Sequence, residues 1–589
     1  MMFAFRKDLP LALWHSAFIP AFLLAGAVAA RAQTAVPPQP AVQPAAPPAS
    51  PAASPAAGPA NSTVVNLIQQ LVQEGVLTQE RAQALIHQAQ DEAASAARGT
   101  PAVAPGAAPA PSASVRVPYI PQVVRNQLRD EVKQEVLREA REENWAAPNQ
   151  VPEWTKRFHL NGDFRLRYEW NLFDSRNSNA FPNFAALNAG PPFDLNNAAG
   201  TPPPILDTTQ DRQRMRIRAR LGFNVDVADG LLAGIRLATG NTTNPVTTNQ
   251  TLGTTLNKQN FLLDRAFLDY HPADWIEVWA GRFANPWIST ELVWDDDINF
   301  DGAAARLRAN LTDNFSLFTT GGAFPIENTA FNFPDNTVQK TPSRDKWLFA
   351  GQLGLGWQPA RNLDFKLAAA YYHFQNIGGV LSSPCVANTN VDVCNTDNTR
   401  PGFQQTGNTM FAIRNLVSNV TNPPLFQYYG LSSRFHDLDV TTRLDYGMGS
   451  IHAVLEGDVV KNLAYSRRAI LASNPVNNIG ANSATGSGVF DGGNLGYQAR
   501  LMVGYPEIRE RWQWNASFGY RHLDSDATPD AFNDSDFHLG GTNAKGYVVS
   551  GSLGVTHNVD LTAKWLSASE VTSLPYTVDV VQVDLNARF

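Results

Sequence analysis

Five arginines stand at every second position of one short segment, and this spacing is the strongest chemical signal in the sequence. They are Arg212, Arg214, Arg216, Arg218 and Arg220. Because side chains alternate between the two faces of a β-strand, a strand here carries all five guanidinium groups on one face. Such a face cannot contact lipid, where one arginine near the bilayer midplane costs roughly 2–4 kcal/mol. We therefore expect it to line a wet space and to orient charged or dipolar solutes.

Further charged side chains extend this wet face onto other segments. The same sign continues at Arg165, Arg167, Arg236, Arg306 and Arg308. The opposite sign gathers on two later segments, at Asp437, Asp439, Asp445, Glu456 and Asp458. In a ring of strands these acidic segments lie opposite the arginines, which predicts a transverse electric field across a pore. The alternative is that the charges solvate a wide lumen and pair with their neighbours.

The chain after Lys156 has the alternating pattern of the strands that must hold these charges. Sixteen strands are predicted, at 157–170, 212–226, 230–240, 259–270, 274–284, 302–310, 314–323, 347–358, 362–374, 434–447, 450–461, 494–504, 512–523, 546–557, 560–568 and 578–589. Short turns alternate with long loops such as 171–211, 375–433 and 462–493. An even strand number with this alternation is typical of outer-membrane barrels, whose short turns are periplasmic.

The predicted fold class is therefore all-β: a transmembrane antiparallel up-and-down β-barrel of about sixteen strands, with a small amino-terminal α-helical extension in the periplasm. Fourteen or eighteen strands would follow if one hairpin were misassigned. Asp264 and Arg265 point to opposite faces under a single alternation, which a β-bulge would reconcile. The aromatic residues Trp512, Trp514, Tyr520 and the terminal Phe589 are expected in girdles at the membrane interface.

The region before the barrel has a different composition. Residues 1–32 have the features of a signal peptide, with Arg6 and Lys7 before an apolar stretch and Ala-x-Ala sites after it, and an uncleaved anchor is the alternative. Ala/Pro-rich linkers at 33–60 and 98–118 bracket a helical unit at 61–97. An amphipathic charged helix is predicted at 119–145, either in a coiled coil or solvated on a neighbour. The barrel domain is predicted at 156–589.

Composition excludes several classes of function. A net charge of −7 and a pI near 5.8 argue against a nucleic-acid binder. No Gly-x-Ser-x-Gly, His-Glu-x-x-His or Walker-type motif occurs, so we expect no enzyme and no cofactor. After the signal peptide, no apolar run is long enough for a transmembrane helix. Cys385 and Cys394 lie close together in a polar segment and are expected to form a local disulfide, with two free thiols as the alternative.

The segments RIRARLGFNV, LAGIRLATGN, LDRAFLDY, AGRFANPW and ELVWDDDINFDGAA, with the terminal aromatic residue, resemble the bacterial family of putative porins. The amino-terminal helical unit with its GVLT turn is similar to that family too, so the resemblance spans nearly the whole mature chain. It implies diffusion of small solutes through a barrel. Together with the architecture it also implies a homotrimer.

The connector 285–301, NPWISTELVWDDDINFD, is unusually acidic. By analogy with general porins, where the loop at this place folds inward, its acidic residues are expected to face the arginines: Glu291, Asp295, Asp296 and Asp297. Its length leaves open how far it reaches. The pattern Asp297-x-Asn299-x-Asp301 also matches the start of a calcium loop, but Arg308 stands where a bidentate glutamate belongs, so we expect no metal.

The sequence thus predicts an outer-membrane porin that passes small hydrophilic solutes and ions passively. The expected partners are outer-membrane lipid, the solutes themselves, and the barrel-assembly machinery acting through the carboxy-terminal strand. Two alternatives remain open: a substrate-specific channel, and an envelope tether that uses the amino-terminal helices.

Overall fold

The computed structural model describes residues 153–196, 200, 202–335, 337–418, 423–480 and 489–589. It also describes Gln83, Lys133, Gln134 and Arg138, each of them helical. Apart from these four positions, the signal peptide, both linkers, the helical unit 61–97 and the charged helix 119–145 lie outside the described residues. They stay predictions.

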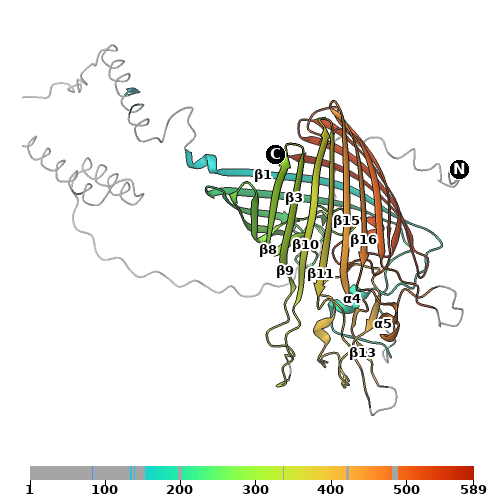
Figure 1. The fold of residues 1–589 in the computed structure, drawn as a ribbon. Coiled ribbons are helices and arrows are strands. Elements are labelled where there is room, and N and C mark those ends of the chain that lie inside the picture. Colours follow the sequence, from blue (N-terminus) through green and yellow to red (C-terminus); the bar gives the residue numbers. More distant parts are fainter. Residues whose placement is uncertain are drawn as a thin grey trace, which may run out of the picture. The chain divides into compact units, whose positions relative to one another are not determined.

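The described chain forms one closed antiparallel barrel of sixteen long strands, as the sequence predicts (Figure 1). The strands are β1 (Phe158–Phe173), β3 (Arg212–Ala228), β4 (Leu231–Thr239), β6 (Phe261–Ala273), β7 (Ile276–Ala284), β8 (Asn299–Thr312), β9 (Phe315–Glu327), β10 (Lys346–Ala360), β11 (Leu363–Gln375), β15 (Phe435–Met448), β16 (Ile451–Asn462), β17 (Leu495–Gly504), β18 (Trp514–Leu523), β19 (Ala544–Thr556), β20 (Val559–Glu570) and β21 (Thr577–Arg588). Short β5 (Gln250–Thr251) adds to β3.

The barrel closes where β1 pairs with both β3 and β21. The terminal Phe589 exchanges two backbone hydrogen bonds of 3.0 Å with Gly162. A Cβ atom at Gly162 would lie 2.5 Å from the Phe589 ring, so only glycine lets the ring cover this point of the seam. The last residue of the chain therefore takes part in closing the barrel.

The two faces of each strand differ as the alternation requires. On β3, Met215, Leu221 and Phe223 are exposed on the outer face, whereas Arg216 between them is buried. Between β4 and β6 the register shifts, and the predicted bulge is found there: Arg236 pairs with Arg265 and Leu237 with Leu263, which skips Asp264. Because of this bulge, the adjacent Asp264 and Arg265 both take part in the polar network of the interior.

Most connectors follow the predicted alternation, and the long loops gather at one end of the barrel together with α4, α5 and β13 (Figure 1). The connector 571–576 departs from it, because it lies at the long-loop end yet is shorter than the turn 505–513 at the other end. The smaller elements are η2 (Glu153–Arg157), α4 (Phe184–Ala189), β2 (Phe193–Asp194), η3 (Asp397–Thr399), β12 (Met410–Ala412), β13 (Phe426–Gln427), β14 (Tyr429–Leu431), α5 (Arg467–Ala472) and η4 (Phe537–Leu539).

A disulfide joins Cys385 and Cys394 within the long β11–β15 connector. At the short-turn end, Trp512, Trp514 and Phe589 are exposed. Tyr520 lies near the other end of β18, where its ring is close to those of Tyr497 and Tyr547. Among the described residues, no helix has the length and apolar character needed to cross a membrane.

Candidate functional site

The β7–β8 loop, residues 285–298, folds into the barrel. Its aromatic side chains pack on inward-facing rings of the wall: Trp287 and Trp294 both meet Tyr372 of β11 nearly edge-on, with centroids 5.7 and 5.3 Å apart. Leu292 and Val293 between them are fully buried. Apolar burial of this kind is the main driving force that holds a segment in place. The loop therefore has its own apolar core against the wall.

Polar anchors fix the same loop at two further points of the wall. Gln352 of β10 accepts a hydrogen bond from the Ile288 amide at 3.0 Å and donates one to the Ile288 carbonyl at 2.8 Å. The Thr290 hydroxyl donates to Asp458 of β16. The loop thus reaches across the interior to strands far from its own hairpin. The sequence analysis had left open how far it reaches.

A second loop, β18–β19 at residues 524–543, also lies inside the barrel. The Asp295 amide donates to the Phe532 carbonyl at 2.8 Å, and the Ser535 amide donates to the Asp295 carboxylate at 2.9 Å. The rings of Trp294 and Phe532 lie 5.6 Å apart. These two segments, which we call the inward loops, therefore form one joined structure across the lumen.

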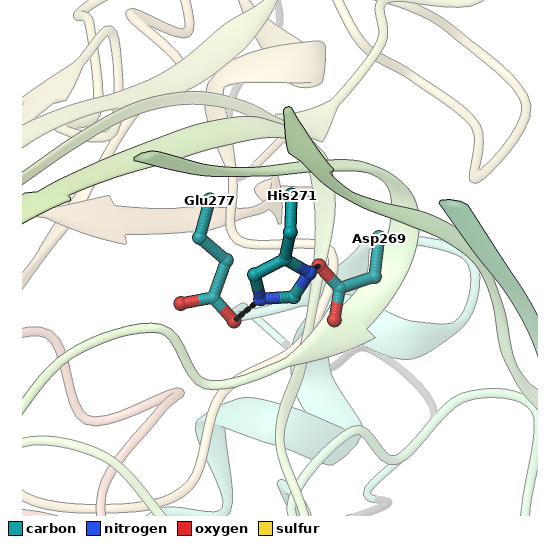
Figure 2. A group of neighbouring side chains, drawn as sticks. All are labelled: Asp269, His271 and Glu277. Carbon is teal, nitrogen blue, oxygen red and sulfur yellow. Dashed lines mark ion pairs between the residues drawn. The ribbon is translucent and has the colours of Figure 1, made fainter. Parts of the chain in front are cut away.

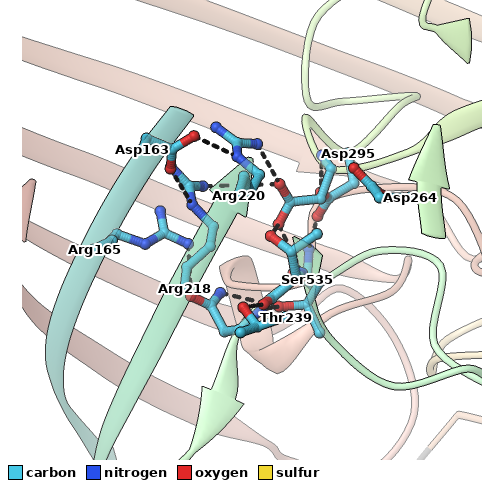
Figure 3. A network of polar contacts seen from close by, with 12 residues as sticks. Asp163, Arg165, Arg218, Arg220, Thr239, Asp264, Asp295 and Ser535 are labelled. Carbon is cyan, nitrogen blue, oxygen red and sulfur yellow. Dashed lines mark hydrogen bonds and ion pairs between the residues drawn. The ribbon is translucent and has the colours of Figure 1, made fainter. Parts of the chain in front are cut away.

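The arginines of β3 find counter-charges directly beside them. Arg218 and Arg220 both bind Asp163 of β1, at 2.9 and 2.6 Å (Figure 3). Arg214 and Arg216 share Glu169, six residues further along β1, at 2.5 and 3.3 Å. The alternating spacing predicted one charged face, and that face is a paired network rather than a row of free cations.

Asp297 of the first inward loop joins this network. Its carboxylate lies 3.2 Å from Arg220 and 3.8 Å from Arg218, and it accepts hydrogen bonds from the amide and hydroxyl of Thr248 at 3.0 and 2.9 Å. Burial opposes ionisation of this carboxyl, but the two guanidinium groups outweigh it and hold the pKa of Asp297 below its usual range. Asp297 thus ties the inward loop to the arginine strand.

Arg167 ties the second inward loop to the closing seam. It binds Asp584 of β21 and Asp536 of the loop, both at 2.8 Å, and is itself almost fully buried. Burial opposes the charge on Asp536, but Arg167, followed by Lys564, keeps the pKa of this carboxyl well below its usual range. Because Arg167 and Asp297 are buried, they fix the loops rather than meet a solute.

Glu291 and Asp296 lie at the open edge of the inward loops. Glu291 is 3.4 Å from Arg521 of β18. Burial opposes ionisation of Glu291, but Lys564, followed by Arg521 and Arg500, outweighs burial and lowers its pKa. Asp296 is exposed. The neighbouring Glu291 carboxylate, followed by desolvation, raises the pKa of Asp296 to about 7. An accessible acidic group and a set of cations therefore share this edge.

Asp295 differs from its neighbours, because it is buried between the inward loops. Burial, followed by the charges of Asp297 and Asp534, raises its pKa well above the ordinary value. Its carboxylate accepts from the Ser535 amide and from the Asp297 amide at 2.8 Å. Asp295 therefore joins the two loops. The sequence analysis expected it to face the arginine strand, and that expectation is wrong.

The expected acidic wall opposite the arginines is wrong for its three central members. Asp437, Asp439 and Asp458 are 0–1% exposed, and both inward loops contribute to this burial: Thr290 of the first donates to Asp458, and Thr528 of the second lies beside Asp437. Glu456 pairs with Arg443 at 2.7 Å and with Arg500 at 2.9 Å. Neighbour pairing, the alternative in the sequence interpretation, describes most of the other predicted charges. Asp445 pairs with His452, Arg212 with Asp207, Arg236 with Asp264, and Arg165 with Asn249 and Asp584, whereas Arg308 is exposed.

The calcium pattern at 297–301 does not form a metal site. Asp297 is bound by arginines, Asn299 accepts from Arg265 at 2.7 Å, and Asp301 binds Arg282 at 3.0 Å. The oxygens of these residues thus face separate guanidinium groups and do not converge on one point. In addition, Arg308 stands where a calcium loop has a bidentate glutamate.

Two hollows flank the first inward loop. One, of about 700 Å³, is lined by Trp294 and Asp297 together with residues of the long-loop end such as Phe403. The other, of about 730 Å³, is lined by Ile288, by Arg306 and Arg308 of β8, and by turns at the short-turn end. Since the loop contributes residues to both, it lies between a hollow on each side.

Sequence reasoning missed the counter-charges Asp163, Glu169 and Asp584 of this network. It also missed Arg500, Arg521, Asp534, Asp536 and Lys564. Arg521 binds Asp534 at 2.8 Å and is buried with it. Arg500 and Lys564 stand on the polar face of strands with apolar neighbours on either side, so the alternation that revealed the β3 arginines could have identified them. The signal at Arg521 is weaker, because His522 follows it. No pattern in the sequence indicated that the β18–β19 loop folds inward.

An all-β closed barrel with an apolar outer face and a charged, loop-filled interior belongs to the class of membrane-spanning β-barrels. The particular family follows from comparison with known proteins. Residues 61–589 match the family described as "Putative porin", and the chain belongs to that family.

Solved structures similar to the chain include OprB of Pseudomonas putida, the outer membrane channel DcaP of Acinetobacter baumannii, and OmpF of Salmonella typhi in complex with daunomycin. OprB shares 11% identity, with a TM-score of 0.39 over 74% of this chain and 95% of its own. DcaP and OmpF each share 11%, with a TM-score of 0.35 over 73% of this chain and 97% of theirs. No curated protein sequence matches the chain.

Proposed function

We propose that this porin-like channel lies in the outer membrane and lets small hydrophilic solutes and ions diffuse through its lumen, with the two inward loops as its constriction. Membership of the "Putative porin" family supports a channel rather than an enzyme. Diffusion through a constricted, water-filled lumen is the function of a wide barrel whose interior is polar. The short-turn end faces the periplasm in this proposal.

One observation carries the proposal: the first inward loop lies between two hollows and presents the exposed Asp296 at an edge with Arg500 and Lys564. Opposite charges on facing sides of a narrow passage admit ions and dipolar solutes and exclude apolar ones. The wide faces of the lumen are lined by partly exposed arginines: Arg165, Arg214, Arg218, Arg220, Arg306 and Arg308.

The test is single-channel recording of the refolded protein in a planar bilayer, with the reversal potential measured under a salt gradient. Steady ohmic steps with weak ion preference support diffusion through a general porin. Small steps that one class of solute blocks would indicate a substrate-specific channel instead. Absence of current from protein shown to be folded would refute the channel function.

Association and assembly are part of the same proposal. The protein would form a trimer and would be inserted by the barrel-assembly machinery, which would engage β21 and its terminal Phe589. The amino-terminal region would lie in the periplasm. Deletion of residues 61–145 separates the roles: loss of trimers with intact monomer conductance indicates association, and envelope defects with intact trimers indicate tethering.

A further inference from the structure

Three metal-ligating side chains meet on the β6–β7 hairpin, beside its short turn. They are Asp269 and His271 of β6 and Glu277 of β7, with the imidazole ring between the two carboxylates (Figure 2). On β6, Leu268 and Tyr270 are exposed on the outer face at 48% and 44%. Because side chains alternate, Asp269 and His271 lie on the lumen side.

The distance between His271 and Glu277 is that between two ligands of one metal ion rather than that of a tight hydrogen bond. His271 Nε2 lies 3.3 Å from Glu277 Oε1, and His271 Nδ1 lies 3.4 Å from Asp269 Oδ1. Two ligand atoms bound tetrahedrally at about 2.0–2.1 Å from zinc are about 3.3 Å apart. Asp269 Oδ1 is buried and placed to accept the proton of His271 Nδ1. This leaves His271 Nε2 and Glu277 Oε1 to face a cation.

We propose that His271 and Glu277 bind a divalent transition-metal ion such as Zn²⁺ at the short-turn mouth of the lumen. His271 Nε2 and Glu277 Oε1 are the protein ligands, and water completes the coordination because His271 is 49% exposed on its side chain. Asp269 accepts the Nδ1 proton, which fixes the tautomer and orients the ring. The nitrogen ligand favours zinc, nickel or copper over calcium and magnesium, which prefer oxygen.

The surrounding charges permit such a site. Arg306 of β8 lies 3.6 Å from Glu277 Oε2, the oxygen that the imidazole does not face. Its guanidinium is also stacked 5.1 Å from the centroid of the Trp279 ring. This arrangement holds Glu277 with Oε1 toward His271. Two carboxylates and one guanidinium leave a net negative charge, which favours a cation. Arg306 also lines the hollow at the short-turn end, so the site adjoins open space.

The experiment is isothermal titration of Zn²⁺ into the full-length, detergent-solubilised protein carrying His373→Gln. This background removes a second imidazole pair, because the rings of His373 and His436 lie 4.3 Å apart. We expect one Zn²⁺ site per chain and none for Mg²⁺. His271→Gln should abolish binding, and Asp269→Asn should weaken it by roughly 10- to 100-fold.

The matched control is His452→Gln. His452 also lies at a short turn and binds one carboxylate, Asp445, at 2.6 Å, but no third ligand joins this pair in the part of the chain that the structure describes. Its loss should leave Zn²⁺ affinity unchanged. Equal Zn²⁺ binding by His271→Gln and its parent, or loss of binding in His452→Gln, would overturn the proposal. Because titration needs no ion current, its result does not depend on whether the barrel conducts.

Discussion

Replacement of Asp296 by asparagine is expected to remove most of the pH dependence of ion selectivity. Glu291 and Asp297 are held by Arg521 and by the β3 arginines, whereas Asp296 is exposed and has a pKa raised to about 7. Its charge is therefore present at pH 9 and absent at pH 5. Acidification should thus reduce the preference of the wild-type channel for cations.

The size of the effect follows from Coulomb's law. A unit charge acting on an ion about 6 Å away in water contributes about 0.7 kcal/mol, or about 0.4 kcal/mol after screening in 0.1 M salt. A cation loses this attraction when Asp296 is protonated, and an anion loses the same repulsion. The permeability ratio of cation to anion should therefore fall roughly 4- to 10-fold between pH 9 and pH 5.

The assay is the reversal potential under a KCl gradient at a series of pH values. Glu507→Gln is the matched control, because it removes one carboxylate from an exposed turn, where Glu507 pairs with Arg509. It should behave as wild type. Asp530, whose pKa burial raises to about 7, titrates in the same range, so Asp530→Asn is measured in parallel and should have the smaller effect. An Asp296→Asn channel that keeps the full wild-type pH dependence would refute the reasoning.

Three further predictions concern the inward loops and their anchors. Gln352→Ala removes two hydrogen bonds to Ile288, each contributing about 1 kcal/mol, and should increase open-channel current noise while Gln358→Ala does not. Arg167→Met leaves Asp536 and Asp584 buried without the arginine and should lower the free energy of unfolding, measured in urea, by about 3–5 kcal/mol. An unchanged urea midpoint would contradict this. Burial lowers the pKa of His538 in the second inward loop to about 4. The histidine of the unfolded chain binds a proton near pH 6.5, so the free energy of unfolding should fall by up to about 3 kcal/mol as the pH drops from about 6.5 to about 4. His538→Gln should reduce this dependence of stability on pH, measured by acid-induced unfolding with tryptophan fluorescence.

The strands could be predicted from the sequence because each carries a complete local signal. On β3 the arginines alternate with Met215, Ile217 and Leu221, so period and face are both fixed within one segment. The bulge at Asp264 was also predictable, since two adjacent charged residues cannot both face inward without one. The sequence also predicted that Phe589 ends the last strand. Its contact with Gly162 could not be predicted, because the two residues are remote in sequence and meet only in the closed barrel.

The site could be predicted only in part, because its contacts are remote in sequence. The acidic run 295–297 marked the right loop, but the three carboxylates have three different environments: a junction between loops, an exposed edge and an arginine pair. Asp437, Asp439 and Asp458 sit on correctly predicted inward faces. Whether an inward face meets water or a folded loop depends on the path of that loop, which alternation does not determine.

Arg167 links the formation of the lumen to the closure of the barrel. Its side chain belongs to the first strand, binds Asp584 of the last strand, and binds Asp536 of the second inward loop. Asp536 therefore obtains Arg167, the first of its cationic neighbours, only when β1 and β21 have come together. Because loss of a buried counter-charge is costly, this loop is most stable in its final place once the barrel has closed. Since Asp295 joins the two inward loops, the final constriction is expected to form after the seam has closed and not before it.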